Sequence, residues 1–261
     1  MAKTIFHTKS EDAVYLVEKL KERNSMRRFT FVPVEEKRIK SIKGKGMLIW
    51  GDGNQHHFSR FFDLRLDDPA LKGDRPIIKV NVDQHEDTFE DAFGYLKKLG
   101  CGNHMLFTAA DENFMVYLAV PRRHKWLAER VVLYGEHNNI KYLAYEDTAG
   151  LGKKKAHLTI DFDAINKFPV CPEWLSYNSC YSAEQFMDMI NMLAKMDVVR
   201  LDLGGFWCPT NRERKVKLHE ALELRNLPED MDEIVFCKEN FKKSIDIVEN
   251  VIHIFEHLAE R

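Results

Sequence analysis

The stretch Lys79-Val-Asn-Val-Asp-Gln-His-Glu-Asp87 ends an apolar run with Asp83, His85 and Asp87, each two residues apart. Side chains of a β-strand repeat their direction every two residues, so an extended backbone would point all three the same way at the end of a strand. Carboxylate oxygens combined with an imidazole suit a divalent ion such as manganese, iron or zinc. This stretch therefore predicts part of a metal site.

Two other segments also end a short apolar run in polar side chains. One places Asp161 and Asp163 after a β-branched run, and the other passes through a glycine turn to His56 and His57. Taken singly, acids after a strand more often form turns or caps, and a lone histidine pair is more often a surface or core feature. The loops at the carboxyl ends of parallel strands converge, however. Together the three segments offer enough ligands for two divalent ions that share carboxylates.

The acidic character of this cluster is itself an argument for metal. Four carboxylates gathered without a cation would repel one another, and their pKa values would rise. Bound metal removes that conflict, as would four separate, solvated acids. We adopt the metal interpretation, in which a metal pair also lowers the pKa of a bridging water and supplies hydroxide near neutral pH.

Composition narrows the class of protein. The 261 residues are 44% hydrophobic and 31% charged, which is typical of a globular enzyme. A net charge of -2 gives no electrostatic case for a nucleic-acid partner. The first ten residues contain no apolar signal region, and no apolar run approaches the ~20 residues that span a bilayer, so we expect no membrane partner. The five cysteines form no CxxC pair and are expected to be reduced, in a cytoplasmic protein.

The pattern along the chain predicts one α/β domain that covers residues 1–261. Apolar stripes at helical spacing predict helices at 9–22, 183–195 and 241–258. Short apolar runs predict strands at 29–34, 47–50, 77–82, 156–160, 198–201 and 233–236. Strands that alternate with helices favour a three-layer α/β/α arrangement with a mostly parallel sheet covered on both faces. Residues 105–146 break this alternation, and their runs at 105–108, 114–120, 131–134 and 142–145 predict a small antiparallel insertion.

The two acidic motifs, at Asp83, His85 and Asp87 and at Asp161 and Asp163, resemble those of the ureohydrolase (arginase and agmatinase) superfamily, which is related to histone deacetylases. In that family Asp-x-His-x-Asp precedes Asp-x-Asp along a parallel sheet, and the resemblance covers roughly residues 46–209. The family's first motif is a Gly-Gly-Asp-His type of turn, but this chain reads Gly-Asp-Gly-Asn-Gln-His-His. The order His56-His57-Phe58-Ser59 is most similar to the family's His-Ser-Leu-Ala, which favours His56 as the ligand and leaves His57 as the alternative.

The resemblance implies a function and a set of roles. Family members use a metal-activated hydroxide, with Mn2+ as the usual ion and Fe2+ as an alternative, to attack a guanidinium carbon and release urea. Asp87, within the ligand set, and His104, which matches the family's proton-shuttling histidine, are the expected catalytic residues. The family's guanidinium-binding Glu aligns with Arg200, which would repel a cation. Asp202 lies two residues further on the same strand face and is the expected substrate-binding carboxylate.

The substrate prediction depends on a further departure from the family. Typical arginases carry Asn and Ser after the Asp-x-His-x-Asp motif to hold the head group of free arginine, whereas residues 88–98 predict a helix without that set. The chain looks most similar to the divergent branch that includes peptide arginases, which convert peptidyl-arginine to peptidyl-ornithine and urea. The expected partner is therefore an arginine-containing peptide, and Trp126, Trp174 and Trp207 are candidates for lining its groove.

Two alternatives stay open. The same metal chemistry can act on a small guanidino compound, on agmatine or on an acetylated amine. A non-catalytic binding module that retained the scaffold is the second alternative, and the divergent first motif supports it. The sequence does not decide between a monomer and a homo-oligomer.

Overall fold

The computed structural model describes residues 3–52, 55–65, 67–69, 76–85, 87, 99, 102–120, 139–144, 147, 150–165, 168, 181–208 and 238–260. The predictions for residues 88–98, 131–134 and 233–236, and for Trp126 and Trp174, lie outside these ranges.

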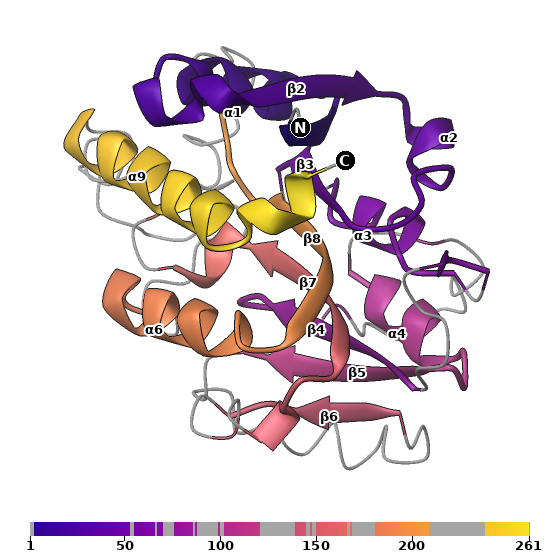
Figure 1. Cartoon of the computed structure of the whole chain (residues 1–261). Coiled ribbons are helices and arrows are strands. Elements are labelled where there is room, and N and C mark those ends of the chain that lie inside the picture. Colours follow the sequence, from indigo (N-terminus) through magenta and orange to yellow (C-terminus); the bar gives the residue numbers. More distant parts are fainter. Residues whose placement is uncertain are drawn as a thin grey trace, which may run out of the picture.

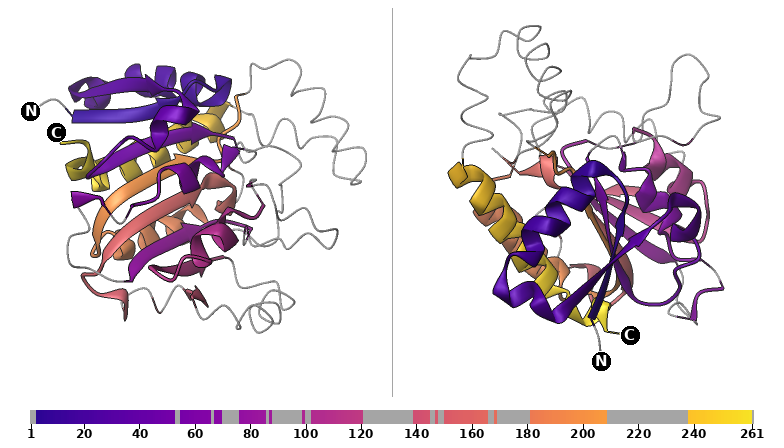
Figure 2. Two further views of the ribbon diagram at one scale, coloured as in Figure 1. Left: turned by 90° about the vertical axis from the view of Figure 1, so that its right-hand side faces the viewer. Right: turned by 90° about the horizontal axis from the view of Figure 1, so that it is seen from above.

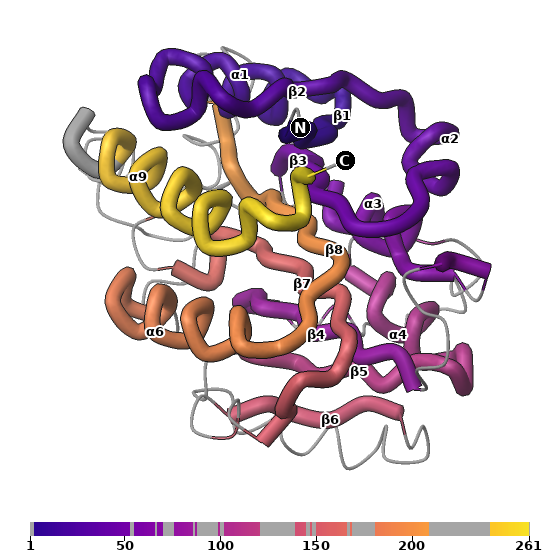
Figure 3. Tube along the Cα trace, in the orientation of Figure 1, coloured from indigo at the N-terminus to yellow at the C-terminus, as the bar shows by residue number. Residues whose placement is uncertain are grey.

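A single sheet organises the described chain. Its eight strands follow the order β2-β1-β3-β8-β7-β4-β5-β6, and all neighbouring strands are parallel. The chain leaves the centre after β3, adds β4, β5 and β6 on the far side, and returns with β7 and β8 to fill the gap between β3 and β4 (Figure 3). The strands are β1 (Lys3–Thr8), β2 (Phe29–Val34), β3 (Gly46–Gly51), β4 (Ile77–Val82), β5 (Phe114–Ala119), β6 (Ile140–Tyr142), β7 (Lys155–Asp161) and β8 (Asp197–Gly204).

Helices cover both faces of the sheet, which gives three layers (Figures 1 and 2). One face carries α1 (Glu11–Lys21), α6 (Ala183–Leu193) and α9 (Lys238–Ile254), and the other carries α2 (Glu36–Ile39), α3 (Phe58–Phe61) and α4 (His104–Ala109). Short 3-10 segments are η1 (Asn24–Arg28), η5 (Phe162–Ala164) and η7 (Glu256–Ala259). Within the described ranges, no helix combines the length and apolar character that crossing a membrane requires.

Local sequence signals account for the starts of helices α1 and α6 and for most of the central strands. Ser10 begins α1 by accepting a hydrogen bond from the Ala13 backbone N–H, and Ser182 and Gln185 form the predicted capping box of α6. The predicted strands at 29–34, 47–50, 77–82, 156–160 and 198–201 are confirmed as β2, β3, β4, β7 and β8. Strand β1 was not predicted, because its run from Lys3 to Thr8 has only two adjacent apolar residues, Ile5 and Phe6, between polar ones.

The antiparallel insertion predicted for residues 105–146 is wrong in the part of the chain that the structure describes. The run at 105–108 lies in helix α4, and β5 and β6 join the sheet in parallel. Helix α4 packs on β5 and buries Met105 and Ala109 with Val116 and Leu118. The three apolar residues at 105–107 fit a short helix as well as a short strand, so the apolar run alone did not distinguish the two.

The two faces of the central strands differ sharply in chemistry. On β4, β7 and β8 the side chains that face α1, α6 and α9 are aliphatic and belong to the main apolar core: Ile78, Val80, Val82, Ala156, Leu158, Ile160, Leu201 and Leu203. The alternate positions face the layer of α3 and α4 and are polar yet almost fully buried: Lys79, Asn81, His157, Thr159, Arg200 and Asp202. Because strand side chains alternate, the metal-motif residues Asp83 and Asp161 continue this polar face at the carboxyl ends of β4 and β7.

Arg200 belongs to this buried polar face, near the start of β8. Its guanidinium donates to Asp68 Oδ2 at 3.0 Å and to the Ile42 carbonyl at 2.7 Å, and it lies 4.3 Å from the centre of the Phe62 ring. These contacts neutralise and solvate a charge that is 1% exposed. The expectation that Arg200 would repel a cationic substrate is therefore wrong, because its charge is engaged within the core.

Replacing Arg200 tests this structural role. The variant R200M keeps the apolar stem but leaves Asp68 without its ion-pair partner, so we expect a loss of about 3 kcal/mol in the free energy of unfolding, measured by urea denaturation. The exposed substitution R38M on α2 is the control and should change it by less than about 0.5 kcal/mol. Equal, small effects of the two substitutions would contradict the assignment.

Candidate metal centre

The predicted ligands come together at the carboxyl ends of three central strands, and a fourth strand lies among them. His56 follows β3, Asp83, His85 and Asp87 follow β4, and Asp161 ends β7, while β8 contributes Gly205 beside Asp161. These strands are neighbours in the order β3-β8-β7-β4, although the chain visits them in a different order. The carboxyl edge of a parallel sheet is where such folds bind ligands.

His56 lies at the centre of one half of the cluster. Its Nδ1 atom is 3.1 Å from Asp83 Oδ2, 2.8 Å from Asp87 Oδ2 and 3.5 Å from Asp161 Oδ2. The imidazole is 2% exposed, and it stacks on the Trp50 ring at a centroid distance of 4.6 Å. One imidazole nitrogen thus faces three carboxylates inside the protein.

The other half of the cluster is built around His85. Its Nδ1 atom lies 2.8 Å from Asp163 Oδ2 and 3.4 Å from Asp83 Oδ1. Backbone N–H groups orient the acids, because His85 N donates to Asp83 Oδ1 and Asp163 N donates to Asp161 Oδ1. His85 is the more accessible of the two imidazoles, with 36% of its side chain exposed. Asp83 is common to both halves.

The donor atoms satisfy the spacing that a metal ion needs. Three groups of three ligands each have donor atoms within 4.8 Å of one another, namely His56, Asp83 and Asp161; Asp83, His85 and Asp163; and His56, Asp87 and His104. The first two groups share Asp83, as expected if a carboxylate bridges two ions. The donor set of oxygens and imidazoles suits Mn2+, Fe2+ or Zn2+.

His57, the alternative ligand, and His104, the expected proton-shuttling residue, lie in different surroundings. Among the described residues, His57 belongs to none of these ligand groups, and its ring packs on Phe58 and Phe61. His56 is therefore the better candidate of the pair. His104 is fully buried at the start of α4, with Nδ1 3.3 Å from Asp87 Oδ2 and its ring 4.2 Å from that of His56. His104 therefore lies within the ligand cluster, whereas the predicted proton-shuttling residue was expected outside it.

Asp87 is held in an unusual backbone conformation. Its φ of 52° lies in the left-handed region that non-glycine residues seldom adopt. Its carbonyl accepts a hydrogen bond from the Met105 backbone N–H, which ties the end of the motif to α4. Such strain persists only where surrounding contacts enforce it, and it occurs frequently at functional sites.

The acids of the cluster carry the electrostatic strain that the sequence predicts. Burial, together with the Asp83 charge, raises the pKa of Asp87 to about 7. Burial and neighbouring carboxylates also raise the pKa of Asp161 and that of Asp163. Asp83 is the exception: burial acts to raise its pKa, but hydrogen bonds from His56 and His85 hold it well below its usual value.

The two imidazoles show the complementary shift. Burial would lower the pKa of each, but Asp87 and Asp83 raise the pKa of His56 well above normal, and Asp163 raises that of His85 to about 12. Without metal, the cluster therefore compensates its negative charge by binding protons. Divalent cations supply the same compensation, so the chain's own donor set fits a metal pair.

Two glycines at the carboxyl end of β8 leave room for side chains of the cluster. A Cβ atom at Gly204 would lie 2.1 Å from atoms of the Trp50 ring, and one at Gly205 would lie 1.8 Å from Asp161 Oδ1. Gly205 also has a φ of +79°, which disfavours any side chain. The Gly-Gly pair thus seats both the indole that supports His56 and a ligand carboxylate, a role that sequence reasoning missed.

The substrate-binding role predicted for Asp202 is wrong. This carboxylate is fully buried beneath the cluster, where it accepts hydrogen bonds from Trp50 Nε1 at 2.8 Å, Thr159 Oγ1 at 2.5 Å and His157 Nε2 at 2.5 Å. All of these partners lie on the buried polar face, and Asp202 is not at the surface where a substrate would approach. Trp207, predicted to line a peptide groove, is only 2% exposed and belongs to the interior.

Sequence comparison and structure comparison give different results. No protein-family model matches the chain, and no curated protein matches it. Among solved structures, arginase from Medicago truncatula matches with a TM-score of 0.57 and 13% identity, covering 96% of this chain and 86% of that one. Formiminoglutamase from Trypanosoma cruzi with Mn2+ matches with a TM-score of 0.58 and 14% identity, covering 87% and 95%.

A hypothetical agmatinase from Burkholderia thailandensis matches with a TM-score of 0.56 and 11% identity, covering 97% of this chain and 85% of that one. The chain therefore has the arginase-like α/β fold. The fold expected from the Asp-x-His-x-Asp and Asp-x-Asp motifs is confirmed, over nearly the whole length of the chain.

Substitution of Gly205 tests the close approach to Asp161. In G205A the new methyl group would displace the Asp161 carboxylate, so we expect metal binding to weaken at least tenfold by isothermal titration with Mn2+. The control G44A has nearly the same backbone, with a φ of +78°, but open space around it, so it carries only the backbone strain of about 1 kcal/mol. Equal metal affinity in both variants would rule out the proposed contact.

The raised pKa values predict how the metal-free protein responds to pH. A carboxyl whose pKa is higher in the folded state binds its proton more tightly there, so its contribution to stability is complete below pH 4 and is lost as pH rises toward 7, the value for Asp87. We expect the free energy of unfolding in EDTA to fall across this range, by up to about 1.4 kcal/mol per pH unit for each proton released. Saturating Mn2+ should reverse the trend. A flat profile in EDTA would contradict it.

Proposed function

We propose that this protein is a metal-dependent hydrolase that cleaves a C–N bond of a guanidino group and releases urea. The observation that carries the proposal is the pair of ligand groups that share Asp83 at the carboxyl edge of an arginase-like sheet. The first group contains His56 and Asp161, and the second contains His85 and Asp163. Mn2+ is the ion we propose, with Fe2+ as the alternative, since the donor set suits both.

The chain's residues divide the chemical work in this proposal. Bound cations would polarise the substrate and lower the pKa of a water molecule, which supplies the nucleophile. Asp87, whose carboxylate lies beside His56 at the edge of the cluster, is placed to hold a proton between the water and the leaving amine. His104 Nδ1, 3.3 Å from Asp87 Oδ2, is placed to exchange that proton with Asp87.

We propose an arginine side chain within a peptide as the substrate. The support is the sequence of residues 88–98, which lacks the Asn and Ser that hold the amino-acid head group in typical arginases. A peptide needs no such contacts, because its α-amino and α-carboxyl groups are tied up in amide bonds. The products would be a peptidyl-ornithine and urea.

Removal of metal ligands tests the activity. D83A takes a ligand from both groups and D163A takes one from the second group, so both should abolish urea release from an arginine-containing peptide in the presence of Mn2+. The surface variant R38M should retain full activity. Circular dichroism should show that both inactive variants remain folded. Full urea release by both would contradict the proposal.

A substrate panel separates the peptide from the small-molecule alternative. Mass spectrometry of the peptide should show the loss of CH2N2, which converts arginine to ornithine, while agmatine and free arginine should be hydrolysed poorly. Activity confined to small guanidino compounds or acetylated amines would favour the first alternative. Tight Mn2+ binding without turnover of any compound would favour a binding module.

A further inference from the structure

The polar face of the sheet holds a continuous chain of hydrogen bonds that begins at the candidate ligand His56. His56 Nε2 lies 3.0 Å from Thr159 Oγ1, and Thr159 Oγ1 donates to Asp202 Oδ1 at 2.5 Å. Asp202 Oδ2 accepts from His157 Nε2 at 2.5 Å, and His157 Nδ1 lies 2.9 Å from Asp63 Oδ1. Every member is at most 6% exposed.

The Thr159 hydroxyl fixes the tautomer of His56. A hydroxyl has one proton, and here that proton is given to Asp202, so toward His56 the oxygen can only accept. His56 Nε2 must therefore carry a hydrogen. In neutral His56, the lone pair is then on Nδ1, the atom that faces Asp83, Asp87 and Asp161.

Nitrogen groups and carboxylates alternate along the far part of this hydrogen-bond chain and hold Asp202 in place. Both ring nitrogens of His157 face carboxylate oxygens, which fixes the orientation of the ring between Asp202 and Asp63. Asp63 also accepts from Lys79 Nζ at 2.6 Å and from Thr108 Oγ1 at 3.0 Å. Burial acts to raise the pKa of Asp202, but the hydrogen bonds from His157 and Thr159 and the nearby Lys79 charge together lower it.

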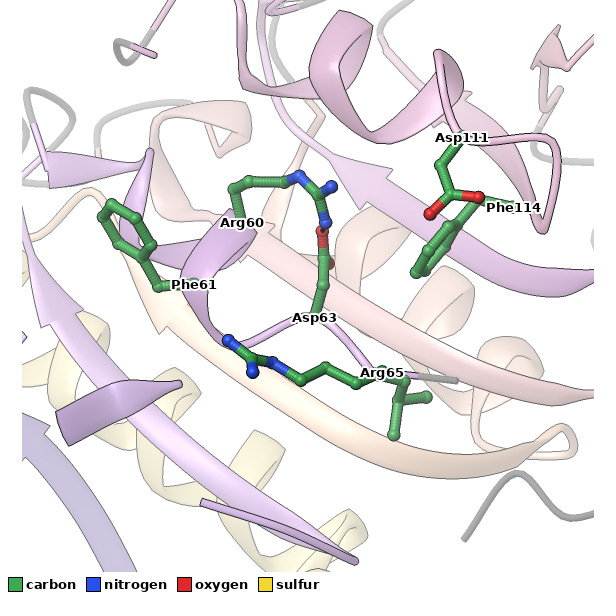
Figure 4. Close-up of a pocket in the computed structure, with 7 residues that line it drawn as sticks. Arg60, Phe61, Asp63, Arg65, Asp111 and Phe114 are labelled. Carbon is green, nitrogen blue, oxygen red and sulfur yellow. Dashed lines mark hydrogen bonds and ion pairs between the residues drawn. The ribbon is translucent and has the colours of Figure 1, made fainter. Parts of the chain in front are cut away.

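The chain of hydrogen bonds that begins at His56 reaches the protein surface at Asp63, on the side of α3 and α4. Asp63 lines a pocket of about 400 Å³ with Arg60, Arg65 and Asp111, and the Arg60 guanidinium caps the Asp63 carboxylate at 2.8 Å (Figure 4). Arg60 is partly exposed, so it closes the buried chain with a solvated charge. Residues from β3, β4, β7, β8 and α3 are thereby joined to one ligand.

We propose that Asp202, acting through Thr159, positions the His56 imidazole for metal binding, and that His157, Asp63 and Lys79 hold Asp202 in place. The proposal rests on the metal centre of the proposed function but not on its substrate. Partners of this kind orient the ring of a metal-ligating histidine and strengthen it as a ligand, and their removal typically costs 10- to 100-fold in metal affinity. Asp202 and Thr159 are positioning residues, since neither reaches the donor atoms of the cluster.

The polar face provides a matched set of variants. T159V keeps the shape of the side chain and removes only the hydroxyl, T159S keeps the hydroxyl, and D202N keeps the shape of the carboxyl group without its charge. R200M is the control, because Arg200 is equally buried, lies on the same face and pairs in register with His157, yet contacts Asp68 instead of the chain.

The experiment measures Mn2+ binding by isothermal titration and the coupling between the two ions by electron paramagnetic resonance. We expect T159V and D202N to weaken one of the two Mn2+ sites 10- to 100-fold and to replace the coupled signal by that of an isolated ion. T159S and R200M should bind as the unmodified protein does. Unchanged affinity in T159V, or an equal loss in R200M, would overturn the proposal.

The same measurements separate this proposal from the proposed function. Two Mn2+ ions bound without urea release would refute the function and leave the positioning role testable by the variants. Failure of the unmodified protein to bind Mn2+ would refute both. Equal weakening of both Mn2+ sites in T159V would refute the positioning role alone, because His85 is not a member of the hydrogen-bond chain that contains Thr159.

Discussion

The pairing of buried charge on one face of the sheet is the constraint on which this structure depends. Lys79, His157, Arg200 and Asp202 are at most 1% exposed, and each has an opposite charge or a polar partner nearby. Burying such groups unpaired would cost several kcal/mol apiece, so helices α3 and α4 and the segment between β3 and β4 must sit where they supply partners. The opposite face needs only shape and apolar area, which α1, α6 and α9 provide.

The candidate metal centre is the place where this internal pairing is incomplete. Within the sheet, Lys79 and Arg200 are paired with acids. At the carboxyl edge, the four carboxylates of the cluster face three imidazoles among the described residues, those of His56, His85 and His104. The raised pKa values of Asp87 and Asp161 express that shortage. The polar face thus runs from self-neutralised charge in the interior to charge that needs an added cation at the edge.

The sequence predicted the parts of this arrangement that rest on local pattern. Period-two spacing identified Asp83, His85, Asp161 and Asp163, and capping signals located α1 and α6. What it missed depends on distant partners. Asp202 has the spacing of a site residue, but its role is decided by Trp50 and His157, which come from other strands. The alternation of Lys79, Asn81 and Asp83 did hold a signal, since polar residues at every second position of a central strand imply a buried polar layer.

Trp50 gives the protein a property that follows from its position. Its indole stacks on His56 and donates its N–H to Asp202, so the ring lies between a ligand and the network beneath it. The emission of a tryptophan depends on the charges and quenching groups around it, and this ring is fully shielded from water. The protein therefore carries an intrinsic fluorophore at the edge of its candidate metal centre, and the fluorescence of this ring can report metal binding without an attached label.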